Sequence, residues 1–78
     1  MNSRNRFIAE VPRDFRKQEI GWLVLEEDVE HTGGWFLYGH RDLDEGSEFD
    51  SWHLKRNEAE HEAETRWGVK AGDWKADA

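Results

Sequence analysis

The sequence predicts an α+β fold in which a three-stranded antiparallel meander carries one C-terminal helix packed on one face. Two observations support this prediction. Segments rich in aromatic and β-branched residues recur between residues 20 and 53, and turn sequences separate them. After them, Ala59, Ala63 and Trp67 recur every four residues, which is typical of one stripe of an amphipathic helix. Strands followed by a helix favour a two-layer sandwich.

The chain of 78 residues is long enough for one small domain and too short for a second. A patch of Phe7, Ile8, Ala9 and Val11 precedes the single proline and would add a fourth strand at the N-terminal edge of the sheet. The expected parts of the domain are a basic N-terminal arm (1–19), the antiparallel sheet (20–54), the helix (55–68) and a tail (69–78).

The strand boundaries follow from the turns. The segment 28–34 is expected to turn because Gly33 and Gly34 can adopt positive φ. A second turn is expected at 41–46, where acidic residues surround one leucine and end at a glycine. The predicted strands are 20–26 (IGWLVLE), 35–40 (WFLYGH) and 48–53 (EFDSWH).

The helix is predicted over 56–67, with its alanines close to the sheet and its charged residues in solvent. Gly68 follows the last apolar residue and suits the left-handed conformation that ends many helices. Val69 is then placed to contact Ala63. The tail is polar except for Trp74, which could fold back onto the domain as a plug.

Both faces of the predicted sheet carry large apolar side chains. Successive residues of a strand point to opposite faces, so Ile20, Trp22 and Val24 are expected to oppose Leu23 and Leu25. One short helix can cover only one face. The second face needs a cover, since large exposed apolar patches are unusual on monomers. Three covers remain open: the arm through Phe7, Ile8 and Phe15, a second copy of the chain, or a separate partner. The residues expected to bind a partner are Trp22, Trp35, Phe36 and Tyr38.

The net charge of −7 is unevenly distributed. Residues 1–20 carry five basic and three acidic groups, whereas residues 21–78 carry six basic and fifteen acidic groups. An acidic body repels phosphate, which argues against nucleic-acid binding and favours a basic protein partner. The basic arm could instead lie on the chain's own acidic body. No signal peptide or membrane span is expected, and the absence of cysteine fits a cytoplasmic setting.

The sequence DSWH (50–53) brings an acid, a hydroxyl and an imidazole together, but we predict no catalytic residue and no cofactor. On a strand, Asp50 lies on the face opposite His53. Ser51 and His53 are about 6.6 Å apart along the strand axis, beyond hydrogen-bond reach. Trp52 is expected to pack in the core.

No metal site is predicted. His40 and His53 could meet across neighbouring strands with Asp42 or Asp50, which makes these four residues weak candidates. The alternating acids of 42–50 resemble the start of a calcium loop. They depart from it because the glycine falls one place early and His53 replaces the final glutamate.

The chain from about residue 20 to 75 resembles a loose group of small uncharacterised bacterial proteins. That resemblance implies the sandwich fold and a bacterial cytoplasmic setting, and it implies no activity. It rests on a hairpin, an entry of D-x-W-H type, a helix with two alanines four apart and a Gly-Val end followed by D-W. These features correspond here to Asp50, Trp52, His53, Ala59, Ala63, Gly68, Val69, Asp73 and Trp74.

These observations favour a small acidic, non-enzymatic domain that binds another protein or itself. A role like that of an immunity protein, which neutralises a basic toxin, would suit the size and charge. The alternative is an enzyme or small-ligand protein, metal-assisted through His40 and His53, with a pocket between helix and sheet.

Overall fold

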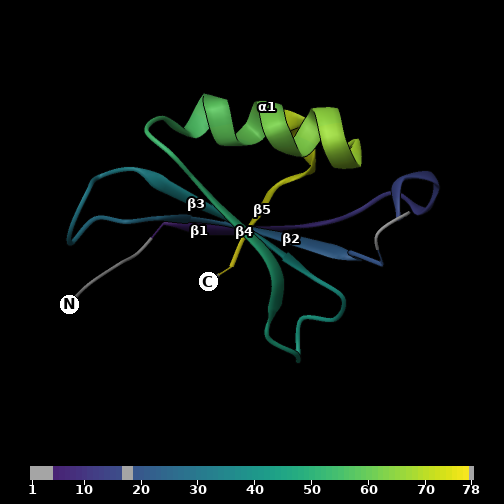
Figure 1. The fold of residues 1–78 in the computed structure, drawn as a ribbon. Helices are drawn as coiled ribbons and strands as arrows, with labels where there is room; N and C mark the ends of the chain where they lie inside the picture. The colour runs from purple at the N-terminus through teal and green to yellow at the C-terminus, as the bar shows by residue number, and fades with distance from the viewer. Residues whose placement is uncertain (1–4, 17–18, 78) are drawn as a thin grey trace.

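A computed structural model describes residues 5–16 and 19–77 as an antiparallel sheet with one α-helix across one of its faces (Figure 1). The strand order is β4-β3-β2-β1-β5, and neighbouring strands are antiparallel. The predicted α+β class is confirmed. The strands are β1 (Arg6–Glu10), β2 (Trp22–Glu27), β3 (Trp35–His40), β4 (Ser47–His53) and β5 (Lys75–Ala76), the helix is α1 (Arg56–Trp67), and two 3-10 turns are η1 (Arg13–Phe15) and η2 (Ala71–Asp73).

The central meander β2-β3-β4 follows the predicted strands closely. Strand β3 has the predicted bounds, and the other two strands shift by one or two residues. Backbone pairing also includes Gly21, the residue before β2. The N–H of Gly21 donates to the carbonyl of His40, and the carbonyl of Gly21 accepts from the N–H of Val11. Gly33 adopts the expected positive φ, 72°, in the turn between β2 and β3.

Strand β1 lies inside the sheet, whereas the sequence placed it at an edge. The short strand β5 pairs with its outer side, with Phe7 opposite Ala76 and Ile8 opposite Lys75. The tail was not predicted to form a strand. It does so because β1 offers unpaired backbone groups and because Trp74, which precedes β5, is held in the core.

Helix α1 begins and ends where the sequence indicates. At its start, the backbone N–H of Lys55 donates to the Glu58 carboxylate at 3.3 Å. At its end, Gly68 has φ of 69° and its N–H donates to the carbonyl of Glu64. A Cβ at Gly68 would lie 2.6 Å from ring atoms of Phe15, so packing as well as backbone conformation requires glycine here.

The hydrophobic core lies between α1 and the sheet. The helix contributes Ala59, Ala63 and Trp67, and the ring of Trp67 meets that of Phe49 edge to face at 5.1 Å. Trp74 is buried, as predicted for a plug. No helix in the described residues is long and apolar enough to cross a membrane. Ile20 also belongs to the core and does not share a face with Trp22 as predicted, because it precedes β2 and strand alternation does not extend to it. The remaining buried members of the core are Ala9, Val11, Leu23, Leu25, Leu37 and Val69.

Candidate functional site

The sheet face opposite α1 carries a second set of apolar side chains. Leu23 and Leu25 point into the core, so strand alternation directs Trp22 and Val24 to the other side. The cross-strand register extends this assignment to every strand, because directly paired residues share a face. We call this surface the open face, and its apolar members are Ile8, Trp22, Val24, Phe36, Tyr38 and Trp52.

The described part of the N-terminal arm does not cover the open face. Phe7 packs against the core beneath α1. Phe15 lies against Gly68 at the end of the helix. Ile8 belongs to the open face itself, since it pairs with Val24. Figure 1 shows α1, the single α-helix among residues 5–16 and 19–77, on the other side of the sheet.

The open face forms a thin apolar layer of its own. Val24 is only 1% exposed although it does not belong to the core beneath α1. Its cover comes from half-buried neighbours, among which Phe36 and Tyr38 stack with ring centroids 5.7 Å apart and planes 18° apart. At the β4 edge, Trp52 is 44% exposed. Within residues 5–16 and 19–77, no helix or further strand packs above this layer, and an apolar sheet face left uncovered in this way is typical of an interaction surface.

The predicted partner-binding residues divide between the two faces. Trp22, Phe36 and Tyr38 lie on the open face. Trp35 instead packs against the core, near the ring of Phe7. It occupies the same strand face as Leu37, and the guanidinium of Arg56 lies over its ring.

Trp52 belongs to the open face and not, as predicted, to the core. Its indole Nε1–H donates to the Thr32 hydroxyl at 3.0 Å. A Cβ at Gly34 would lie 2.4 Å from its ring, so the indole rests on the turn between β2 and β3. The alternation of side chains along β4 could have predicted this placement. Phe49 points into the core, and Trp52, three residues later, therefore lies on the opposite face.

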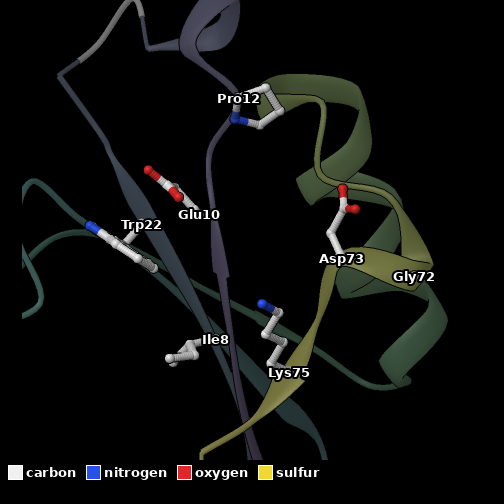
Figure 2. Close-up of a pocket in the computed structure, with 7 residues that line it drawn as sticks. All are labelled: Ile8, Glu10, Pro12, Trp22, Gly72, Asp73 and Lys75. Carbon is white, nitrogen blue, oxygen red and sulfur yellow. The ribbon is translucent and has the colours of Figure 1, made fainter.

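A hollow of about 380 Å³ lies at the β1 end of the open face (Figure 2). It exists because β5 pairs with only two residues of β1, and the chain before β5, from η2 to the buried Trp74, does not pair with β1. The Glu10 carboxylate accepts from Arg16 and that of Asp73 from the backbone N–H of Lys70. The lining residues are Ile8, Glu10, Pro12, Trp22, Gly72, Asp73 and Lys75.

The predicted alternative function needs a pocket between helix and sheet, and the hollow lies on the other side of the sheet. Ala59, Ala63 and Trp67 are at most 1% exposed, so α1 is packed tightly on its face. The hollow carries two carboxylates and one ammonium but no nucleophile beside a base.

Beneath α1, a polar cluster joins the helix to β4. The Ser51 hydroxyl and His53 Nε2 both donate to Oε1 of Glu62, each at 2.7 Å. Arg66 donates to Oε2 of Glu62 at 3.0 Å. Burial alone would raise the pKa of Glu62, but the hydrogen bonds from Ser51, His53 and Arg66 outweigh it, so its pKa lies below the usual value.

The prediction that Ser51 and His53 lie out of reach of each other is wrong. Ser51 Oγ and His53 Nε2 are 3.2 Å apart, because the imidazole leans along the strand. The contact still does not activate the serine. Nε2 carries the proton that it donates to Glu62, so it has no lone pair to accept a proton from Ser51. The cluster therefore acts as a clamp between helix and sheet.

We expect acid to remove the contribution of Glu62 to stability. Its pKa is lowered in the folded state, so the carboxylate stabilises the fold above its unfolded pKa, and this stabilisation is lost as the pH falls through the folded pKa. Glu62→Gln should lower the free energy of unfolding by about 1–3 kcal/mol at pH 7. Below about pH 5 the variant should lose less further stability than the wild type.

Urea unfolding at several pH values measures both effects. The control is Glu64→Gln, on the exposed side of α1, which should keep the wild-type pH dependence. Equal losses of stability below pH 5 in the wild type and Glu62→Gln would contradict the role of this cluster.

The four weak metal candidates are not brought together. His40 and His53 lie at opposite ends of the β3–β4 pair and on opposite faces, since one pairs with Ser47 and the other with Trp35. Asp42 accepts the backbone N–H of Asp44 within its turn, and Asp50 lies exposed on the open face. Among the residues that the structure describes, no three metal-binding side chains converge.

No family model, curated protein or solved structure matches the chain. The resemblance to small bacterial proteins stays a prediction.

Proposed function

We propose that the protein is a small acidic, non-enzymatic binding domain that docks a protein partner, either a different protein or a second copy of the chain, on its open face. The observation that supports this most directly is the thin aromatic layer on that face. Aromatic side chains that are half-buried and rigidly stacked bind partners at low entropic cost, and Trp and Tyr are the residues that most often dominate such interfaces.

The charge of the chain limits the chemistry of the partner. Acidic side chains lie at the β4 edge of the open face and in the turn before it, among them Asp44, Glu48 and Asp50. With a net charge of −7, the chain repels acidic surfaces at long range. The surface that docks here should therefore present apolar side chains with basic groups at the β4 side. A basic toxin, as in the immunity-type role, would be one such partner.

Site-specific photo-crosslinking in the organism that encodes the chain tests this function. A crosslinking phenylalanine analogue replaces Tyr38 on the open face or, as the matched control, His61 on the exposed side of α1. We expect position 38 to give a discrete covalent product at a yield at least about tenfold higher than position 61. A partner docked on the open face contacts position 38 and does not contact the exposed surface of α1. Similar yields at both positions, or none at position 38, would overturn the proposal.

The captured protein must then bind in purified form. Phe36→Ser and Trp52→Ser should each weaken binding at least about tenfold, since they remove aromatic anchors from the face. Asn57→Ser, on the exposed helix surface, should leave the affinity unchanged. Circular dichroism checks that each variant is folded, and Trp52→Ser keeps the test informative if Phe36→Ser is not, because Trp52 is 44% exposed.

A further inference from the structure

One row of directly paired residues crosses all five strands on the open face. Lys75 on β5 pairs with Ile8, and Ile8 pairs with Val24. Val24 pairs in turn with Tyr38, which pairs with Asp50 on β4. Paired residues share a face, so the row begins with an ammonium, continues through three apolar side chains and ends with a carboxylate.

The two charged ends of this row are available for a partner. Lys75 and Asp50 are both exposed, and neither makes an ion pair or side-chain hydrogen bond within the described residues. Val24 lies on the third of the five strands, at the midpoint of the row. The row is therefore apolar about its centre and opposite in charge at its two ends.

We propose that the open face is covered by a second copy of the chain, related by a two-fold axis that runs parallel to β2 between the two sheets. This inference rests on the proposed function and names its partner. A two-fold interface must be self-complementary. Rotation about this axis exchanges β5 with β4 and β1 with β3. It places Lys75 over Asp50 of the second copy, Ile8 over Tyr38 and Val24 over Val24.

A second position on the same face fits the same axis. Glu10 on β1 pairs with Trp22, which pairs with His40 on β3. The rotation sets Glu10, whose carboxylate also accepts from Arg16, over His40 of the second copy, and it brings the two Trp22 rings together on the axis. Glu26 also lies on β2 and faces its own copy across the axis, which opposes association.

The size of the face predicts a weak dimer. Five strands at about 4.8 Å spacing make the row roughly 19 Å long, and six residues along β2 add about 20 Å in the other direction. The projected area is then around 400 Å² per copy, below the roughly 800 Å² per partner of stable complexes. Together with the net charge of −7, this predicts a dissociation constant in the micromolar range or above.

Charge exchange at the ends of the row tests the proposal by sedimentation equilibrium. Asp50→Lys gives a chain that is basic at both ends of the row, and Lys75→Asp gives one that is acidic at both ends. Each should dimerise at least about tenfold more weakly than the wild type, since each homodimer then sets like charges against each other. A mixture of the two variants should form a heterodimer at least as tight as the wild type.

The control Glu64→Lys separates this geometry from net charge. It changes the charge of the chain as Asp50→Lys does, but on the exposed side of α1. If only net repulsion mattered, both substitutions would strengthen association. The proposal expects Asp50→Lys to weaken it and Glu64→Lys to preserve or strengthen it.

Three results would overturn the dimer. The first is a wild type that stays monomeric up to about 1 mM. The second is an Asp50→Lys variant that associates as tightly as the Glu64→Lys variant. The third is a mixture of the Asp50→Lys and Lys75→Asp variants that forms no heterodimer. Failure of the dimer and of the proposed function can be told apart. A monomer that still crosslinks a different protein from position 38 keeps the function and removes the dimer, whereas loss of every product from that position removes both.

Discussion

Trp67→Ala is expected to leave the protein mostly unfolded or close to its unfolding midpoint at 25 °C. The side chain is 1% exposed, and its ring meets Phe49 edge to face while the guanidinium of Arg66 lies over it. Truncating a buried tryptophan costs about 3–5 kcal/mol. At roughly 0.05–0.15 kcal/mol per residue, a domain of 78 residues has only about 4–12 kcal/mol to lose.

Urea unfolding followed by circular dichroism measures this loss, and the chain offers a matched control. Trp52→Ala removes the same side chain from the open face, where it is 44% exposed. That variant should lose about 1 kcal/mol, mainly from the hydrogen bond to Thr32. Equal losses in the two variants would mean that the sheet face under α1 does not hold the dominant core.

The elements that were predicted well are those whose signals are local. The alanine stripe and Gly68 define α1 within one stretch of chain, because helix periodicity and the left-handed end depend on neighbouring residues. Strand β3 is bounded by Gly34 and the acidic turn after His40 for the same reason. Strand β5 could not be predicted from Lys75 and Ala76, since it depends on β1, which is distant in sequence.

The candidate site was predicted only in part, because the sequence does not show which sheet face the helix covers or how far a side chain extends. Alternation along the strands indicated two apolar faces but not which of them α1 covers, so Trp35 was grouped with Phe36. The contact between Ser51 and His53 was missed because a distance along the strand axis ignores the length of an imidazole. Glu62, from the helix, was not considered, because nothing local connects it to Ser51.

The position of β1 also changes what an N-terminal deletion can reveal. Removing residues 1–16 would unfold or aggregate the protein if the arm covered the second face. The structure shows that the same deletion removes an inner strand of the sheet, which pairs with β2 and β5. Unfolding is now expected whether or not anything covers the open face. Substitutions on the face itself are therefore the informative experiments.

Two C-terminal truncations that differ by one residue should differ strongly in stability. Removing residues 75–78 deletes β5 and the exposed ion pair between Arg6 and Asp77. Such surface contacts and two residues of ladder contribute about 1–2 kcal/mol. Removing residues 74–78 also deletes Trp74, which is 9% exposed and belongs to the core. This should cost about 3–5 kcal/mol more, enough to abolish cooperative unfolding.

The indole N–H of Trp74 adds a second expectation to this experiment. Its Nε1 is buried and has no acceptor among the described residues, which offsets part of the gain from burying the ring. In the full chain, Trp74→Phe should therefore lose much less stability than Trp74→Ala, since phenylalanine keeps most of the ring and removes the unpaired donor. Thermal unfolding of the four variants checks both points. If the truncations at 74 and 75 melt together, the tail is held by β5 pairing, and the aromatic plug contributes little.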